Sequence, residues 1–555
     1  MAEPISSRAR RSARAAYGTP AQAGVSRSAF AALHGVPLWH YLAALALGAA
    51  HTLSFAPTPA GGWLELALFA LFYSCLSRTR HWKSAALTGG AFGFGNFVTG
   101  VWWLYVSMHD YGGMPASLAI AALVLFSIYL ALYPALAAGV WSVSAGHSHR
   151  ASAGNTFSRN WLGALAFASA WALGEWLRGT VFTGFPWLAS GYAQVDGPLA
   201  GFAPIVGVYG VGWAVALVAA LLVQAIDRLL ARPPRRALAL PPALAALALV
   251  VAGAALSQVT WTHPDGAPLS ARILQGNVKQ EMKFDEAGVT AAIALYEKMI
   301  TAKPADLIVT PETAVPLLPQ QFPEPFGRAV RQFADSTGSS ILLGAFGAKI
   351  TPDGQITDPT NSLIGVTPRS AVLYRYDKHH LVPFGEFVPW GFHWFVRLMN
   401  IPLGDLASGK PVQPPFHVRH QAIDVDICYE DIFGEEIARR LREAATPASV
   451  LVNVSNLAWF GKTIALDQHL QMARMRTLET GRPLLAATNT GASASIDSKG
   501  RVLARLPVLT LGALDVQVQG MTGTTPYIAT GNLTVLAVSL ALLVLCVAQA
   551  RRRRN

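Results

Sequence analysis

The sequence predicts a membrane protein of two parts, a domain of eight transmembrane helices and a layered α/β domain held outside the cytoplasm. Three observations lead to this fold class. The chain has 555 residues, of which 52% are hydrophobic and only 13% are charged, whereas soluble proteins carry about 25% charged residues. Only six of its 31 acidic residues precede residue 260. From residue 270 onward, short β-rich runs alternate with helical stretches.

Eight apolar runs are candidates for membrane-spanning helices, each of which needs about 20 mostly apolar residues. The runs lie near residues 38–56, 62–77, 85–107, 115–143, 161–178, 201–226, 237–257 and 528–550. A long basic segment precedes the first run and further spans follow it. We therefore expect the first run to be a retained anchor and not a cleaved signal peptide.

Basic residues indicate the orientation of these spans. Arginine and lysine gather before the first span, between the second and third, after the fourth and the sixth, and at 551–554. The alternate loops 57–61, 108–114 and 179–200 contain neither residue, which is the positive-inside pattern for a cytoplasmic N-terminus. The net charge of +12 therefore favours membrane orientation over nucleic-acid binding. We expect a basic cytoplasmic tail (1–35), helices one to seven (36–258), an extracytoplasmic domain (259–527), helix eight (528–550) and a second basic tail (551–555).

The extracytoplasmic domain has the pattern of an α/β layered fold. Its strand-like runs are nearly continuous apolar stretches, which are typical of a sheet covered on both faces. The runs lie at 271–277, 306–312, 340–346, 361–367, 421–430, 448–456, 482–489 and 512–518. Helical stretches lie near 286–302, 323–337, 434–444 and 464–480. Ligands gather at strand ends in such sheets, so the polar residues that end these runs are the candidates for a site.

Cys428 is the one cysteine of this domain, because Cys75 and Cys546 lie in apolar runs. It has no partner for a disulfide within the domain, and an unpaired thiol outside the cytoplasm indicates reactivity or intermolecular pairing. It ends a β-like run and is followed by Glu430 and Asp431. A single cysteine is more often buried and inert. The lysine and glutamate at other strand ends favour the reactive interpretation.

Glu312, Lys378 and Cys428 together have the chemistry of a nucleophilic site. A thiol attacks strongly only as thiolate, and its ordinary pKa is about 8.5. A carboxylate acts as general base towards the thiol. A lysine ammonium offsets the thiolate charge and stabilises the oxyanion that forms when a carbonyl is attacked, with the backbone N–H after the nucleophile as a second donor. This chemistry needs no metal and no cofactor.

These residues stand in motifs that resemble a known superfamily. Glu312, then "DKHHLVPFGE" (377–386), then "CYE" (428–430) is similar to the Glu–Lys–Cys set of the nitrilase superfamily. The membrane frame narrows the resemblance to the apolipoprotein N-acyltransferases of bacterial envelopes. Further stretches that carry the resemblance are "TGFPW" (183–187), "LQGN" (274–277), "TPETAVP" (310–316), "SNLAWFG" (455–461) and "HLQMARMRTLETGRPLLAATNTG" (469–491). The likeness extends over nearly the whole chain apart from the N-terminal tail.

The resemblance implies a fold and a role for each residue. It implies a nitrilase-like α-β-β-α sandwich for 259–527, with Glu312 as general base, Lys378 as oxyanion donor and Cys428 as nucleophile. Glu386 and Glu430 then support Lys378 or relay protons, and Tyr429 supplies the backbone N–H beside the thiol. Phe284, Trp394, Phe395 and Trp459 are expected contacts of substrate or lipid. Phe284 stands in "MKFDE" where the family often has tryptophan, so an aromatic wall remains but the indole N–H is lost.

The implied activity is acyl transfer in two steps at a bacterial inner membrane, the final step of lipoprotein maturation. Cys428 first takes an acyl chain from a phospholipid, expected to be phosphatidylethanolamine, as a thioester. The α-amine of the diacylglyceryl-modified N-terminal cysteine of an apolipoprotein then takes it as an amide, which is a ping-pong order. No nucleic-acid partner and no cofactor are implied, and we expect a monomer.

Other interpretations remain open at this point. A membrane-tethered amidase or nitrilase would use the same residues with water as the second nucleophile. A transporter or lipid-binding scaffold is a weaker alternative, since it gives no reason for the three residues to coexist at strand ends. Glu175 and Arg178 form either a structural ion pair on one helix face or a path for a lipid head group.

Two further features have alternative interpretations. The aromatic stretch 389–404 is either a core helix or an arm that enters the lipid surface, and 315–326 is a possible second arm. His379, His380 and His469 lack the spacing of a metal site, so we expect them to pack or to hydrogen-bond.

Overall fold

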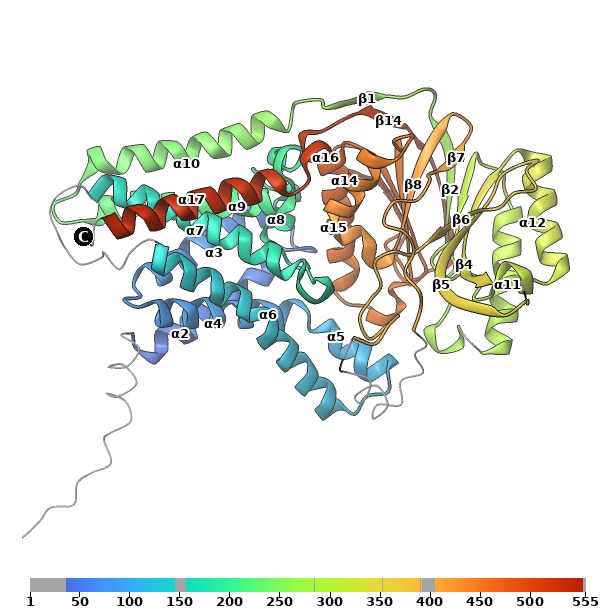
Figure 1. Cartoon of the computed structure of the whole chain (residues 1–555), viewed down its shortest axis with the longest axis horizontal. Coiled ribbons are helices and arrows are strands. Elements are labelled where there is room, and N and C mark those ends of the chain that lie inside the picture. Colours follow the sequence, from blue (N-terminus) through green and yellow to red (C-terminus); the bar gives the residue numbers. More distant parts are fainter. Residues whose placement is uncertain are drawn as a thin grey trace, which may run out of the picture.

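The computed structural model describes residues 36–144, 156–283, 285–351, 353–389, 391 and 405–552. It has a helical bundle at one end and a two-sheet sandwich at the other (Figure 1). The chain passes from the bundle to the sandwich after α10 and returns at α17. A two-stranded ribbon of β1 (Thr262–Pro264) and β14 (Met521–Gly523) lies at this crossing. The sandwich is thus an insertion between two helices of the bundle.

Each of the eight predicted apolar runs forms a helix. These helices are α2 (Leu38–His51), α3 (Gly61–Ser77), α4 (Trp82–Gly100), α6 (Ala116–Ser144), α7 (Thr156–Arg178), α9 (Ala203–Leu230), α10 (Arg236–Leu256) and α17 (Leu533–Arg552). A short α5 (Trp103–Val106) follows α4. The eighth run divides, because α16 (Pro526–Thr530) ends at Gly531, whose φ of 54° breaks the helix before α17 begins.

Four stretches in the described part of the chain are long and apolar enough to cross a membrane. They are Ala116–Ser144, Ala200–Leu230, Arg236–Leu256 and Leu533–Arg552. The prediction of a membrane domain with several spanning helices is therefore confirmed. Four of the eight predicted spans have the length and hydropathy that a membrane-crossing helix needs. α2 has 14 residues and α3 has 17, which are fewer than the roughly 20 that a perpendicular span requires.

Glycines in α4 allow its backbone to approach its neighbours closely. A Cβ added to Gly95 would lie 2.1 Å from the carbonyl oxygen of Leu45 on α2, and one added to Gly89 would lie 2.4 Å from that of Pro134 on α6. Helices in lipid gain no hydrophobic driving force from one another, so close van der Waals contact through small residues replaces it. These glycines therefore explain how α2, α4 and α6 pack together.

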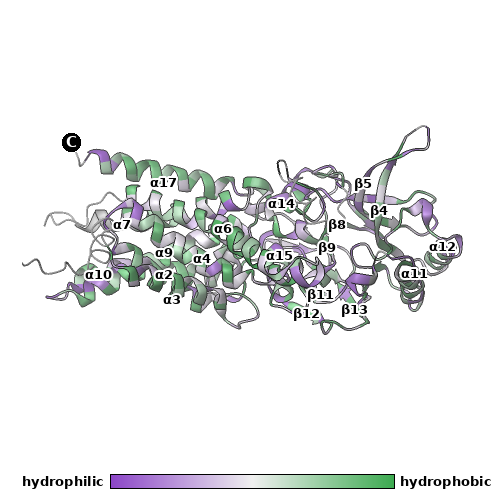
Figure 2. Cartoon of the chain, turned by 90° about the horizontal axis from the view of Figure 1, so that it is seen from below, coloured by the Kyte–Doolittle hydropathy of each residue, from purple (hydrophilic) through white to green (hydrophobic). Residues whose placement is uncertain are grey.

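Large apolar side chains cover the outside of the bundle. Leu125 and Leu132 of α6, Leu247 of α10 and Leu540 of α17 are each more than half exposed. Figure 2 shows hydrophobic residues along these helices, with hydrophilic residues concentrated near their ends and over the sandwich. An apolar surface of this extent is stable in lipid and not in water, which confirms that the chain is a membrane protein.

The sandwich has two six-stranded sheets. The first, in the order β13-β2-β3-β4-β5-β6, contains β2 (Leu269–Gln275), β3 (Leu307–Val309), β4 (Ser340–Ile350), β5 (Ile356–Val366), β6 (Tyr374–Asp377) and β13 (Gly512–Val518). The second, in the order β12-β11-β10-β9-β8-β7, contains β7 (Phe416–Val418), β8 (Gln421–Ile427), β9 (Val450–Ser455), β10 (Leu484–Thr488), β11 (Ala494–Ile496) and β12 (Val502–Arg505). The central strands β2-β3-β4 and β8-β9-β10 are parallel, and the outer pairs are antiparallel.

Helices cover both outer faces of the paired sheets, so the predicted α-β-β-α sandwich is confirmed. Residues of β2, β8 and β9 pack together between the sheets. α11 (Glu286–Thr301) and α12 (Glu324–Thr337) pack on the first sheet. α14 (Gly434–Glu443) and α15 (Ala465–Thr480) pack on the second sheet. Leu470 and Ala473 of α15 face that sheet, whereas Met472 and Met475 join the core of the bundle.

Candidate active site

The three predicted residues follow strands of both sheets. Glu312 lies three residues after β3, Lys378 directly after β6 and Cys428 directly after β8. β3 and β6 belong to the first sheet and β8 to the second, so the site lies where the ends of the two sheets meet. Strand ends of this kind are where α/β sheets place their ligands.

Glu312 is a buried carboxylate with fixed hydrogen bonds. Its Oε1 accepts a bond of 2.7 Å from Asn361 Nδ2, and its Oε2 accepts one of 2.7 Å from the backbone N–H of Asn456. Asn361 is on β5 and Asn456 follows β9, so both sheets hold this side chain in place. Such rigid holding is what a general base needs, because its orientation must be set before the proton moves.

Lys378 is 1% exposed and lies between two carboxylates. Its Nζ is 2.8 Å from Glu386 Oε2 and 3.6 Å from Glu312 Oε1. Glu386 is itself held by bonds of 2.9 Å from Asn361 Nδ2 and from the backbone N–H of Val382. Asn361 therefore donates to both carboxylates, and the structure joins Glu312, Lys378 and Glu386 into one buried network.

Cys428 occupies a strained turn. It is partly exposed, has a φ of 56° and begins a 3₁₀ turn (Cys428–Ile432) at the end of β8. A non-glycine residue in this left-handed region costs of order 1–3 kcal/mol and persists only where its surroundings enforce it. A strand-to-helix turn of this kind lifts the nucleophile out of the sheet in α/β-hydrolases. The carbonyl of Cys428 accepts a bond of 3.2 Å from Asn453 Nδ2, which helps to hold the turn.

Glu430 joins this turn to the segment that carries Lys378. Its carboxylate accepts bonds of 2.7 Å from the N–H of Ile427 and of His379, and one of 3.1 Å from the N–H of His380. The hydroxyl of Tyr376 donates to it at 3.0 Å. Glu430 thus binds residues close to both the lysine and the thiol, which makes it a structural bridge between the two.

The electrostatics differ among the three residues. Burial raises the pKa of the Cys428 thiol well above its ordinary value, and the charge of Glu312 raises it further, while Lys378 acts in the opposite direction. Burial also opposes ionisation of Glu312, but the charges of Lys378 and Lys283 outweigh it, so the pKa of this carboxyl is lowered. Burial opposes the charge of Lys378, but Glu386 and Glu312 outweigh it and raise its pKa. The resting site therefore contains a neutral thiol beside an ionised carboxylate.

Tyr429 links the site to the bundle. Its hydroxyl donates a bond of 2.9 Å to the carbonyl of Gly184, in the loop between α7 and α8 (Ser190–Ala193). Arg178, at the end of α7, donates from Nη1 to the carbonyls of Phe185 and Trp187 in the same loop, at 2.5 and 2.6 Å. The loop next to the nucleophile is thus tied to the end of a bundle helix.

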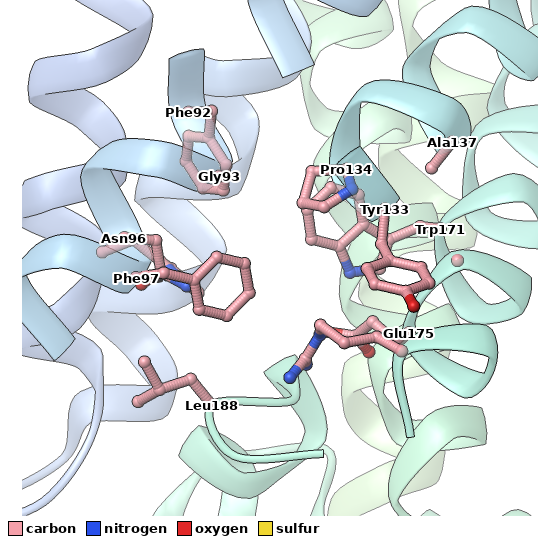
Figure 3. A pocket seen from close by; sticks show the side chains of 13 residues that line it. Phe92, Gly93, Asn96, Phe97, Tyr133, Pro134, Ala137, Trp171, Glu175 and Leu188 are labelled. Atoms are coloured by element: carbon pink, nitrogen blue, oxygen red, sulfur yellow. Dashed lines mark hydrogen bonds between the residues drawn. The ribbon is translucent and has the colours of Figure 1, made fainter. Parts of the chain in front are cut away.

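Glu175 and Arg178 both hold this loop. Glu175 accepts bonds from the backbone N–H of Ser190 at 2.7 Å and from its hydroxyl at 2.9 Å. Figure 3 shows the pocket within the bundle that both residues line, with Phe97 and Tyr133 on its walls and Leu188 of the same loop at its edge. Both side chains thus have structural partners, but each binds the loop or the first residue of α8, and the expected ion pair between the two is not formed.

The remaining predicted residues have different outcomes. Trp459 lies in the 3₁₀ turn Leu457–Phe460, is 38% exposed and follows Asn456, whose N–H binds Glu312. Phe284, Trp394 and Phe395 lie outside the described residues, as does most of the expected arm at 389–404. Within the described ranges, no group of three or more His, Cys, Asp or Glu side chains is placed to hold a metal ion.

Sequence reasoning missed two residues of the site, Asn361 and Lys283. Asn361 and Asn456 bind Glu312, and Lys283 donates a bond of 3.1 Å from Nζ to the Glu312 carbonyl. His469 of α15, which was expected to pack or to hydrogen-bond, is buried with its Nε2 3.4 Å from Asp431 Oδ1, and burial lowers its pKa to about 4. A polar residue ending a strand run was the signal available for Asn456, whereas a single Asn inside a strand or a single Lys in a loop carries no pattern.

The two-sheet sandwich is a carbon–nitrogen hydrolase domain, here carried by a membrane bundle. Residues 255–527 match the carbon–nitrogen hydrolase family, and residues 47–221 match the apolipoprotein N-acyltransferase N-terminal domain.

Curated relatives match along nearly the whole chain. The chain is 53% identical over 513 residues to the apolipoprotein N-acyltransferase of Ralstonia nicotianae, covering 92% of this chain and 93% of that one. It is 42% identical over 545 residues to that of Bordetella bronchiseptica, covering 94% and 98%, and 41% identical over 505 residues to that of Nitrosomonas europaea, covering 90% and 95%. The chain belongs to the apolipoprotein N-acyltransferase family.

Proposed function

We propose that this enzyme N-acylates the diacylglyceryl-modified N-terminal cysteine of apolipoproteins, using a phospholipid as acyl donor and Cys428 as carrier. The observation that carries the mechanism is the buried network in which Lys378 lies 3.6 Å from Glu312 and 2.8 Å from Glu386, with Cys428 within its electrostatic reach. A neutral thiol, an ionised carboxylate and an ammonium are the groups that covalent acyl transfer requires.

In the first half-reaction, Glu312 takes the proton of the Cys428 thiol as the sulfur attacks the ester carbonyl of the phospholipid. The negative charge that develops on the carbonyl oxygen is stabilised by the Lys378 ammonium and by the backbone N–H of Tyr429. When the ester C–O bond breaks, the leaving alkoxide takes the proton from Glu312. Lysophospholipid departs, and a thioester remains on Cys428.

In the second half-reaction, the α-amine of the apolipoprotein cysteine attacks the thioester carbonyl. Glu312 accepts a proton from the amine, the C–S bond breaks and the proton returns to the sulfur. The product is an amide, and the free thiol is restored. Each substrate uses the same base in turn, so one site serves two bulky lipids without binding both together.

The membrane placement supports this pair of substrates. We propose that all eight bundle helices cross a bacterial inner membrane, with both termini in the cytoplasm and residues 259–527 in the periplasm, because every basic cluster of the sequence falls on one side. Shorter helices such as α3, with 17 residues, cross where the bilayer thins locally. We further propose a monomer with phosphatidylethanolamine as the preferred donor.

The test separates acyl transfer from hydrolysis. Purified enzyme is loaded with phospholipid, freed of lipid and mixed with a diacylglyceryl-cysteine peptide that has a free α-amine, or with the same peptide acetylated at that amine. We expect rapid discharge onto the free amine to give an amide, and a stable adduct with the acetylated peptide. Equal discharge in both mixtures, with release of fatty acid, would identify water as the acceptor and contradict the proposal.

A further inference from the structure

Lys283 is a second buried lysine at the site. It is 5% exposed, and its Nζ donates to the carbonyl of Glu312 at 3.1 Å. The charges of Glu312 and Cys428 both act on it. Burial of an ammonium costs free energy unless a nearby negative charge compensates, so a buried lysine in this position indicates a role in the charge balance of the site.

The segment that carries Lys283 is fixed to the second sheet. Asn489 accepts a bond of 2.9 Å from the N–H of Val278 and donates one of 2.8 Å to its carbonyl. Asn456 donates a bond of 2.7 Å to Gln280, while its own N–H binds Glu312. Asn456 therefore holds the segment with its side chain and the carboxylate of Glu312 with its backbone N–H, which keeps Lys283 next to Glu312.

The distances around Lys378 show why a second cation matters. Lys378 lies 2.8 Å from Glu386 but 3.6 Å from Glu312, so its charge is shared and is nearer to the other carboxylate. The charged and titratable groups that face Glu312 come from several elements. They are Lys378 after β6, Glu386 in the following loop, Lys283 before α11, Cys428 after β8 and His469 on α15.

We infer that Lys283 is a positioning residue whose ammonium keeps Glu312 ionised as the base for Cys428. With both lysines charged, two ammonium groups balance the carboxylates of Glu312 and Glu386. Without Lys283, one ammonium serves two carboxylates, and one of these must bind a proton more readily. Burial lowers the pKa of Lys283 to about 8, so its ammonium is still the main form at pH 7.

The inference rests on the proposed function, and the pH dependence of Cys428 acylation tests it. The rate at which a phospholipid acylates Cys428 in a single turnover is followed by intact mass from pH 5 to pH 8. The enzymes compared are wild type, Lys283→Met, Lys283→Arg and Lys279→Met. Lys279 is an exposed lysine of the same segment, so its replacement is a matched control.

Loss of the Lys283 charge raises the pKa of Glu312. The pH at which the acylation rate falls on acidification therefore rises, by about one to three pH units. We expect Lys283→Met to be about tenfold slower than wild type at pH 5 and within about threefold of it at pH 8. Lys283→Arg keeps the cation, so its acylation rate should depend on pH as that of the wild type does. Lys279→Met should leave the pH profile unchanged.

Two results would overturn the inference. One is a wild-type profile in Lys283→Met, and the other is a rate reduced by the same factor at every pH, which indicates a purely structural role. If Lys283→Met does not fold, Lys283→Gln replaces it as the neutral variant and is compared with Lys283→Arg, which keeps the charge. The same pH profile in these two variants would also contradict the inference. Absence of any adduct in the wild type would instead contradict the proposed function itself.

Discussion

At the residue scale, the site depends on one shared amide. Asn361 Nδ2 donates to Glu312 at 2.7 Å and to Glu386 at 2.9 Å, and its backbone carbonyl accepts the N–H of Lys378 at 2.8 Å. One side chain of β5 therefore sets the separation of the two carboxylates that flank the lysine. Hydrogen bonds to ionised groups contribute about 1.5–3 kcal/mol each, so this residue matters for both stability and chemistry.

Replacing Asn361 by leucine removes both donated bonds at nearly constant volume. We expect the acylation of Cys428 to slow about tenfold or more, because the two carboxylates lose their common donor and Glu312 its orientation. The rate of adduct formation at pH 7 measures this effect.

Ser362→Ala is the matched control. Ser362 is the next residue of β5, points to the opposite face and bonds Asp377 at 2.6 Å. It should lower the melting temperature without slowing acylation. Equal rates in Asn361→Leu and wild type would show that Asn361 does not orient the base.

The sequence was sufficient to predict Glu312, Lys378 and Cys428 as candidates, because Glu312 and Cys428 stand at the ends of predicted strand runs, Lys378 stands in the motif 377–386, and together they have a recognisable chemistry. It was not sufficient for Asn361 or Lys283. An asparagine within a strand and a lysine in a loop are ordinary residues there, and their importance arises from contacts between segments far apart in the chain. Asn361 and Glu312 are 49 positions apart, and Lys283 and Glu312 are 29 apart.

At the scale of the elements, close packing of α2, α4 and α6 depends on which face of α4 each glycine occupies. A Cβ at Gly95 would lie 2.1 Å from the Leu45 carbonyl oxygen, whereas one at Gly90 would lie 3.5 Å from the Cβ of Ala135, an ordinary contact. The two positions are five residues apart on the same helix and differ mainly in the space beside them.

Gly95→Ala should therefore separate α4 from α2 and lower the melting temperature in detergent by several degrees, since backbone atoms cannot yield to the new methyl group. Gly90→Ala should change the free energy of unfolding by no more than about 1 kcal/mol, and in the stabilising direction, because alanine is the better helix former. Thermal unfolding of both variants measures the difference. Equal melting temperatures for the two variants would contradict the packing argument.

Element prediction succeeded where periodicity is sustained and failed where strands are short. Each predicted helix and each of the eight strand runs is present, whereas β1, β6, β7, β11, β12 and β14, with three or four residues each, were not predicted. Strands of this length are set by their partners and not by their own pattern. The predicted run 38–56 is longer than the 14 residues of α2, because the run continues through the 3₁₀ turn Thr52–Ser54.

At the scale of the whole molecule, α15 joins the sandwich to the bundle. Arg476 and Glu479 are fully buried on this helix, with Arg476 Nη1 3.2 Å from Glu479 Oε2. Glu479 Oε1 accepts the backbone N–H of Val208 at 2.8 Å, next to the kink of α9 at Gly207. A carboxylate of the sandwich thus satisfies a free N–H within a bundle helix, which makes the two parts interdependent.

Arg476→Met leaves the Glu479 carboxylate buried without its cation and should lower the free energy of unfolding by about 3–5 kcal/mol. Arg474, two residues earlier, pairs with Asp196, which is about half exposed. Because surface pairs contribute about 1 kcal/mol or less, Arg474→Met should have a far smaller effect. Thermal unfolding in detergent compares the two variants. A larger loss in Arg474→Met would show that the buried pair does not hold the sandwich to the bundle.

The proposed mechanism requires that a fatty acyl group reside on one particular sulfur. The chain offers three, and Cys75 and Cys546 are buried in the bundle, far along the chain from the sheet ends. The most direct measurement is peptide mapping by mass after incubation with phospholipid alone. We predict one acyl group per chain, on the peptide that contains Cys428, released by hydroxylamine and absent from Cys428→Ser. An acyl group on another residue, or an undiminished adduct in Cys428→Ser, would contradict the account.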